Sequence, residues 1–309
     1  MSLLVVLISC ASEEPPEAGP GQEDTERPSS YTYLPETDSV PPLDLASLED
    51  SLNSLFSELL DLNAAPAIRS YEVAMASSDD SCPAYYEQDG NTFWYATCDS
   101  EAGGAYDGYA FYTLYEEYDL FGDGTPWDAI VLSGAADVVE PDGDRYHLGG
   151  SAYLGEAHIP EADLYISVTS GSFFAEGDEV AGTWITSGSA PSLTLYGARY
   201  DAYDINIMLM SGSTPVTSGD LSAVQLNDLT LYTPYPGVYP CAEPSGSMGV
   251  RDTAGNWYSI EFDVVLEGET YTAPEGTCDG CATVFHGDEA LGEVCIDPTP
   301  VIAWENTPW

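Results

Sequence analysis

The chain has 309 residues, with 53 acidic side chains, five arginines and no lysine. Its formal net charge of −48 repels phosphate backbones and anionic headgroups, so no nucleic acid partner is expected. Because lysine is absent, the sequence excludes functions that depend on a P-loop lysine, a Schiff-base lysine or a lysine general base.

A short apolar run opens the chain and ends at Cys10, where an acidic, proline-rich segment begins. Its last residues, Leu7-Ile8-Ser9-Cys10, resemble the lipobox of bacterial lipoproteins. The resemblance implies that residues 1–9 are a signal peptide and that acyl chains on Cys10 anchor the protein in a membrane, at about 0.8 kcal/mol per buried CH₂. Ala11 stands where the retention signal of the inner membrane places aspartate, which implies an outer-membrane or cell-surface location.

An accidental apolar N-terminus or an ordinary signal peptide is the alternative, since the run is short and no Lys or Arg precedes it. With its lipobox, its acidic composition and its paired cysteines, the chain resembles uncharacterised acidic cell-envelope lipoproteins of Gram-negative bacteria. Residues 10–42 are predicted to be a tether, because proline, glycine, serine and carboxylates bury too little surface to fold. The alternative is a coil packed on the domain.

Residues 43–78 are predicted to be a helical segment. Within 43–63 the leucines recur at alternating spacings of three and four and so line one helix face: Leu45, Leu48, Leu52, Leu55, Leu59 and Leu62. Asp44 or Ser47 can cap the start. Further apolar residues widen the stripe, which favours packing on a sheet over a two-stranded coiled coil. A second, shorter helix over 67–76 is compatible with the pattern.

Residues 79–235 predict a series of strands separated by turns. The segments 106–120, 127–139 and 144–158 are rich in aromatic and β-branched residues, with glycine, aspartate and proline between them. The links have hairpin length and no helical pattern interrupts them. The predicted fold class is therefore all-β, an antiparallel meander closed as a sandwich or barrel and preceded by one amphipathic helix. Residues 236–309 are predicted to be a Cys-rich β extension of the same domain.

Disulfides are expected for the six cysteines after Cys10, because an exported protein meets oxidising conditions. A hairpin with its loop at 89–91 places Cys82 opposite Cys98 and Tyr86 opposite Trp94, within bridging distance. The sequence therefore predicts a Cys82–Cys98 disulfide. Closing that loop contributes about 3 kcal/mol on the chain-entropy model.

The last four cysteines favour two more disulfides: Cys241, Cys278, Cys281 and Cys295. The preferred pairing joins Cys281 to Cys295 across a hairpin and Cys241 to Cys278. A zinc site is a weaker alternative, because only one CxxC is present. A redox CxxC is weaker still, because such a site needs a strand–helix context that 278–281 lacks.

Residues 117–134 resemble the calcium loops that begin strands in blade-type repeat proteins, with Asp119, Asp123 and Asp128 as weak candidate ligands. Calcium takes six to eight oxygens, so carboxylates must alternate in such a loop. Phe121 stands in place of the second acid and Asp128 comes one residue late. A plain Asp-Gly turn is therefore preferred, and no cofactor is predicted.

Motifs of catalysis are absent: the sequence contains no GxSxG, HExxH or GxGxxG, and no catalytic residue is predicted. The three histidines lie far apart in the sequence, and none belongs to a metal or triad motif: His147, His158 and His286.

The function predicted first is a structural or binding role for a lipid-anchored protein of the cell envelope, with the membrane as its partner through the lipid. The alternative is an extracellular carbohydrate- or ligand-binding module that uses aromatic strand faces, with Trp94, Trp127 and Trp184 as candidates. A contiguous exposed aromatic strip on one sheet face would favour this alternative. A carboxylate-based hydrolase on a β scaffold is the second alternative.

Overall fold

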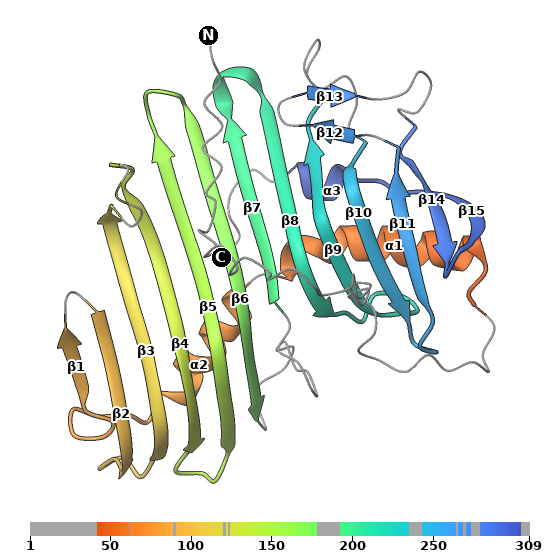
Figure 1. Cartoon of the computed structure of the whole chain (residues 1–309). Helices are drawn as coiled ribbons and strands as arrows, with labels where there is room; N and C mark the ends of the chain where they lie inside the picture. Colours follow the sequence, from red (N-terminus) through yellow and green to blue (C-terminus); the bar gives the residue numbers. More distant parts are fainter. Residues whose placement is uncertain are drawn as a thin grey trace, which may run out of the picture. The chain divides into compact units, whose positions relative to one another are not determined.

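Thirteen strands form one antiparallel sheet whose spatial order follows the chain from β1 to β15, with each strand hydrogen-bonded to the next (Figure 1). The computed structural model describes residues 42–303 except 63, 89–90, 120–121, 123, 178–191, 235–242, 264, 268–269 and 273–278. All described residues belong to one compact unit. Cys10 and residues 10–41 of the predicted tether lie outside them.

The strands of the large sheet are β1 (Tyr85–Gln88), β2 (Asn91–Asp99), β3 (Ala105–Tyr118), β4 (Trp127–Val139), β5 (Arg145–Ile159), β6 (Leu164–Gly177), β7 (Ser192–Tyr200), β8 (Ile205–Pro215), β9 (Leu221–Tyr232), β10 (Ser245–Asp252), β11 (Trp257–Phe262), β14 (Cys281–His286) and β15 (Glu289–Cys295). A separate two-stranded sheet pairs β12 (Val265–Glu267) with β13 (Thr270–Thr272). A 3₁₀ turn, η2 (Asp201–Tyr203), links β7 to β8.

This arrangement confirms the predicted all-β meander with a helix ahead of it. It does not show the expected closure as a sandwich or barrel, because β1 and β15 are the two ends of the strand order and are not paired with each other. Helices instead cover one face of the sheet (Figure 1). A sheet can bury one face in this way and leave the other in solvent, so closure is not required for a core.

The leucine stripe of the first helix packs on the sheet, as its width predicts. Helix α1 (Leu45–Glu58) starts at Asp44, whose Oδ1 accepts a hydrogen bond from the Ser47 amide at 3.0 Å. Buried side chains run along one side of α1 and include Leu48, Leu52 and Leu55. The predicted continuation to residue 63 is a 3₁₀ turn, η1 (Leu59–Asp61).

The second helix, α2 (Ala65–Ala74), begins two residues earlier than the sequence indicates, with proline in its first turn. It packs against the sheet through Tyr71, whose hydroxyl accepts a hydrogen bond from the Trp94 indole nitrogen at 2.9 Å. Tyr71 also stacks on Tyr112 of β3, with ring centroids 5.2 Å apart. Burial raises the pKa of Tyr71, so its hydroxyl stays protonated at every physiological pH.

Alternate residues of each strand form the hydrophobic core beneath the helices. Leu132 and Ala136 of β4 lie opposite Ala152 and Leu148 of β5, and all are at most 5% exposed. Across the C-terminal strands the same layer contains Met248, Val250, Ile260 and Val284. The last helix, α3 (Thr299–Ile302), joins this core through Val301 and Ile302. Among the described residues, no helix combines the length and apolar character needed to span a membrane.

Candidate functional site: an aromatic face and an acidic pocket

The first candidate site is a group of aromatic side chains on the sheet face opposite the helices. We call it the aromatic face and define it by Tyr86, Phe93, Tyr95, Tyr109 and Phe111. Tyr86, Tyr95 and Tyr109 are 53%, 76% and 50% exposed, and the two phenylalanines are half-buried. Large apolar side chains gathered in solvent on a folded protein mark a binding surface more often than scattered ones do.

Strand register explains why these rings lie together. Tyr86 of β1 is opposite Phe93 of β2, and Phe93 is opposite Phe111 of β3. In the next row, Tyr95 is opposite Tyr109. Directly opposed residues point to the same face and lie about 4.5–5.5 Å apart, so the two rows form one surface across three strands. The Tyr86 and Phe93 rings stack, with centroids 5.7 Å apart.

Small side chains continue both rows onto β4. Ser133 is opposite Phe111, and Ala135 is opposite Tyr109. On β4 the two aromatic rows therefore end in small side chains, which do not cover the rings.

A polar row borders the aromatic face. Thr97, Asp107, Asp137 and His147 are opposed in turn on β2, β3, β4 and β5, and all four are exposed. The Thr97 hydroxyl donates to Asp107 Oδ1 at 2.7 Å, and His147 Nδ1 lies 2.7 Å from Asp137 Oδ1. Carboxylate, hydroxyl and imidazole groups next to aromatic rings provide acceptors and donors for a ligand rich in hydroxyl groups.

Two of the tryptophans proposed from the sequence, Trp94 and Trp127, do not contribute to this surface. Trp94 is 1% exposed, because its side chain points to the helix face and bonds Tyr71. Trp127 is 2% exposed. Trp184 lies outside the described residues. Tyrosine and phenylalanine form an exposed strip of the kind that would favour the ligand-binding alternative, whereas the candidates Trp94 and Trp127 are buried.

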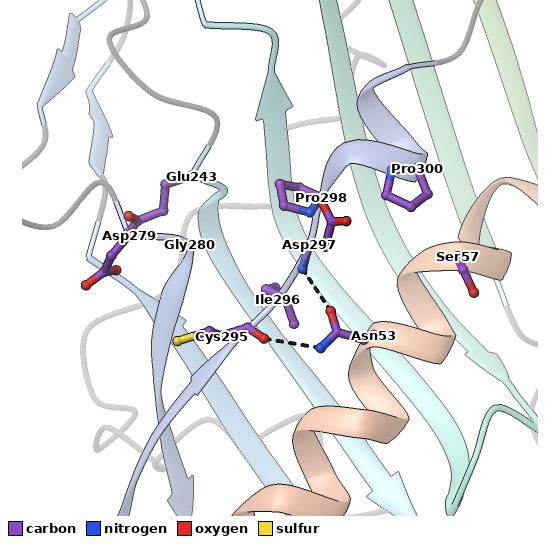
Figure 2. A pocket seen from close by; sticks show the side chains of 10 residues that line it. All are labelled: Asn53, Ser57, Glu243, Asp279, Gly280, Cys295, Ile296, Asp297, Pro298 and Pro300. Carbon is purple, nitrogen blue, oxygen red and sulfur yellow. Dashed lines mark hydrogen bonds between the residues drawn. The ribbon is translucent and has the colours of Figure 1, made fainter.

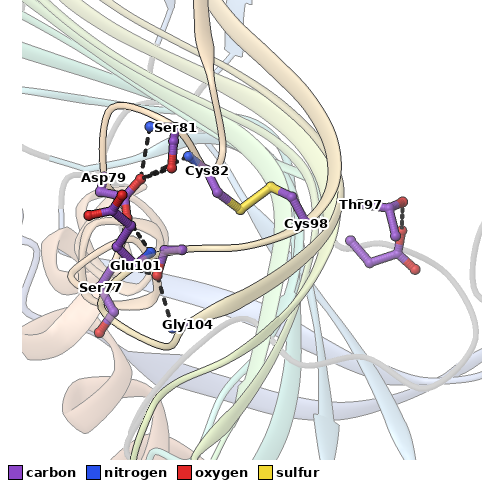
Figure 3. Close-up of a disulfide and its surroundings, with 10 residues drawn as sticks. Ser77, Asp79, Ser81, Cys82, Thr97, Cys98, Glu101 and Gly104 are labelled. Atoms are coloured by element: carbon purple, nitrogen blue, oxygen red, sulfur yellow. Dashed lines mark hydrogen bonds between the residues drawn. A yellow bond between two sulfur atoms is a disulfide. The ribbon is translucent and has the colours of Figure 1, made fainter.

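Cys82 and Cys98 form the predicted disulfide, with Cα atoms 5.9 Å apart (Figure 3). The predicted register is wrong by one residue, because Tyr86 is opposite Phe93 and not Trp94. Only residues 89 and 90 separate the two strands, an Asp-Gly pair that suits a two-residue hairpin link better than the three-residue loop expected. Cys82 lies before the first residue of β1, Tyr85, and therefore forms its disulfide with Cys98 from outside the paired part of the hairpin.

Cys281 and Cys295 also form the predicted disulfide, from directly opposed positions on β14 and β15. Their bond leaves neither thiolate for a zinc ion or for a redox pair with Cys278. Cys241 and Cys278 lie outside the described residues.

The candidate calcium residues do not gather into a site in the described part of the chain. Asp128 Oδ1 accepts a hydrogen bond from the Glu117 amide at 2.9 Å, where the backbone of Glu117 has a φ of 48° and the pairing of β3 with β4 shifts register. Asp119 is exposed, and Asp123 lies outside the described residues. No group of three or more His, Cys, Asp or Glu suited to a metal occurs among the described residues.

Asp79 holds the loop around the first disulfide (Figure 3). Its Oδ1 accepts from the amides of Ser81 and Cys82 at 2.8 and 3.0 Å, and its Oδ2 accepts from the Glu101 amide at 2.5 Å. These bonds favour the ionised carboxylate, and the hydrogen bonds from Ser81 are the largest cause that lowers the Asp79 pKa to about 2.

We expect Asp79→Asn to lower the melting temperature at neutral pH and to have little effect in strong acid. A carboxyl group with a lowered folded-state pKa adds stability that is complete above its unfolded value of 3.8 and is lost as the pH falls through about 2. Thermal unfolding followed by circular dichroism between about pH 7 and about pH 2 tests this. The matched control is the exposed neighbour Asp80→Asn, and a pH-independent difference between wild type and Asp79→Asn would contradict the explanation.

A pocket of about 760 Å³ lies at the C-terminal end of the sheet (Figure 2). Its lining comes from α1, from Glu243 before β10, from the residues before β14 and from the link between β15 and α3. Asn53 fixes that link to the helix, because its amide nitrogen donates to the Cys295 carbonyl at 3.2 Å and its Oδ1 accepts from the Asp297 amide at 2.8 Å. Glu49, one turn earlier on α1, accepts from the Cys295 amide at 2.8 Å.

Carboxylates dominate the polar side of the pocket, in Glu243, Asp279 and Asp297. Burial raises the pKa of Glu243, whereas hydrogen bonds from Thr299 lower the pKa of Asp297. Sequence reasoning missed this pocket, because the loops that build it carry no motif.

Comparison with known proteins gave no match to a family model, to a curated protein sequence or to a solved structure.

Proposed function

We propose that the protein is a lipid-anchored binding protein of the cell envelope whose aromatic face holds an uncharged extracellular polysaccharide. The aromatic face carries the proposal. Aromatic rings offer large, rigid apolar area against the C–H faces of sugar rings, and tyrosine adds a hydroxyl for hydrogen bonding. The polar row from Thr97 to His147 supplies further partners for sugar hydroxyls.

Charge narrows the ligand class. With a formal net charge of −48, the surface repels polyanions at moderate ionic strength. Two carboxylates, Asp107 and Asp137, lie opposite each other beside the aromatic face, so the repulsion is also local. An uncharged polysaccharide avoids this cost, which favours it over acidic glycans.

Tyr95→Ala and Tyr109→Ala are each expected to weaken binding to hydroxyethylcellulose about tenfold, and the double variant more, because each removes an exposed ring from the same row. Native affinity gels with hydroxyethylcellulose in the matrix measure this, with alginate as the polyanionic comparison. Leu114→Ala is the control, since Leu114 is 61% exposed and, unlike Tyr95 and Tyr109, does not belong to the aromatic face.

Wild type that migrates equally with and without hydroxyethylcellulose would overturn the proposal. Equal retardation of wild type and the tyrosine double variant would also overturn it, because the ligand would then sit elsewhere.

The anchoring part of the proposal rests on the lipobox and is supported by two disulfides in the described residues, since disulfides persist mainly in exported proteins. Metabolic labelling with a fatty acid is expected to label the wild type and not Cys10→Ser. The intact mass of the purified protein should correspond to a chain that begins at Cys10 with acyl groups attached. An unacylated chain that retains Met1 would contradict the anchor while leaving the aromatic face to its own test.

A further inference from the structure

The side chains on the open face of β2 to β5 form rows that run across the strands. Tyr95, Tyr109 and Ala135 are opposed in turn on β2, β3 and β4. The polar row from Thr97 to His147 is the next row and is opposed in turn on all four strands. Side chains on one face of a strand recur every second residue, about 6.7 Å apart, so the two rows are parallel and adjacent.

The spacing within each row suits a sugar chain that crosses the strands. Each row has one residue per strand, and neighbouring strands of a sheet lie about 4.8 Å apart. A pyranose unit in an extended β-1,4-linked chain advances by a similar distance, so a chain laid along a row places one sugar over each strand. A chain laid along a strand would pass the polar row after one sugar, and most of that row would have no contact with it.

We propose, on the basis of the function proposed above, that the ligand is an extended, linear β-linked glycan of at least four sugars that crosses β2 to β5. The exposed rings of Tyr95 and Tyr109 hold two of the sugars by their C–H faces. The polar row borders all four sugars, with one side chain beside each. The occupied surface is therefore longer than the aromatic face, which ends at β3.

Hydrogen bonds within the polar row orient its carboxylates. The Thr97 hydroxyl donates to Asp107 Oδ1 at 2.7 Å, and His147 Nδ1 lies 2.7 Å from Asp137 Oδ1. The Asp137 side chain is 69% exposed, and a carboxylate with its two oxygens accepts more than one hydrogen bond. A ligand that carries many hydroxyl donors complements these acceptors, and hydrogen bonds to a charged acceptor are the stronger ones.

Chain shape separates this ligand from other uncharged glycans. An α-1,4-linked glucan coils, so its successive sugars turn away from a row of side chains on a sheet. Asp137 distinguishes the two shapes, because it lies on β4, one strand beyond the last ring of the aromatic face. Only a chain that continues across the sheet from Tyr109 reaches it, which makes Asp137 the residue that reads ligand length and shape.

Isothermal titration of the full chain with cellotetraose tests the proposal, with cellobiose as the shorter ligand and maltotetraose as the coiled ligand of the same composition. We expect cellotetraose to bind at least about tenfold more tightly than either. Asp137→Ala should remove most of that gain and leave the cellobiose affinity within about twofold of wild type. The matched control is Asp288→Ala, which removes the same charge from the exposed turn between β14 and β15 and should bind all three ligands as wild type does.

Asp137→Ala is expected to keep the wild-type melting temperature, because an exposed pair such as Asp137 with His147 adds little stability. This separates weaker binding from misfolding. Equal affinity for cellotetraose and maltotetraose, equal affinity for cellotetraose and cellobiose, or equal affinity of Asp137→Ala and Asp288→Ala for cellotetraose would overturn the crossing geometry. If the wild type were still retarded by hydroxyethylcellulose in those cases, the proposed function would stand, whereas a wild type that binds neither would overturn both.

Discussion

Leu52→Ala is expected to lower the free energy of unfolding by about 2–5 kcal/mol, the range for a leucine removed from a packed core. Leu52 is 0% exposed in the middle of α1, and its side chain belongs to the cluster that joins the helix to the sheet. Truncation loses the transfer free energy of the side chain and leaves a cavity, because α1 is fixed by the Asn53 and Glu49 hydrogen bonds to the link after β15 and cannot collapse onto the gap.

Urea unfolding followed by tryptophan fluorescence measures this loss, with an unchanged dependence on urea concentration as the sign that the folded state is otherwise intact. Leu114→Ala is the control, because a leucine that is 61% exposed should change stability by no more than about 0.5 kcal/mol. If Leu52→Ala and Leu114→Ala lost similar amounts, α1 would not pack on the sheet.

Local patterns in the sequence were sufficient for the fold class. The leucines from Leu45 to Leu59 predict a helix with one buried side, and burial of Leu48, Leu52 and Leu55 agrees. Turn chemistry predicts the meander, because short links such as residues 140–144 between β4 and β5 cannot hold a crossover. The closure was not predictable from such patterns. Whether a sheet folds on itself or is covered by helices depends on the area that the helices bury, which strand alternation does not encode.

The aromatic face shows a second limit. Trp94 and Tyr95 are neighbours in β2, yet one is 1% exposed and the other 76%. Side chains alternate between the two faces along a strand, so a shift of one residue in the strand register would bury Tyr95 and expose Trp94. Both tyrosine and tryptophan were candidates for an exposed aromatic face, but the larger indole of Trp94 fills the core beside Tyr71.

The acidic pocket could not be inferred from sequence at all. Glu243, Asp279 and Asp297 come from three separate loops, among 53 acidic residues that offer many equivalent sets. The packing of the link after β15 against α1 helps to bring them together, and burial separates Glu243, at 2% exposure, from the exposed Asp279 and Asp297.

Removal of the first disulfide is expected to affect both stability and binding. Cys82→Ala/Cys98→Ala should lose about 3 kcal/mol, as expected for a loop of 16 residues on the chain-entropy model. The Cys281–Cys295 disulfide closes a loop of similar length, 14 residues, so the double variant Cys281→Ala/Cys295→Ala should lose a similar amount of stability. The two variants therefore lose similar stability but remove a constraint from opposite ends of the sheet, at β1 in the first and at β14 and β15 in the second.

Only the first variant should weaken binding to hydroxyethylcellulose. Strand β1 is an edge strand of four exposed residues that pairs with β2 alone, and the Cys82–Cys98 bond holds the chain just before it. Without that bond β1 frays, so Tyr86 leaves the stack on Phe93 and the aromatic face narrows to two strands. Affinity gels at a temperature where both double variants remain folded measure the difference. Equal binding by the two variants would show that β1 contributes nothing to the binding surface, and a loss in the Cys281 variant alone would move the polysaccharide site to the other end of the sheet.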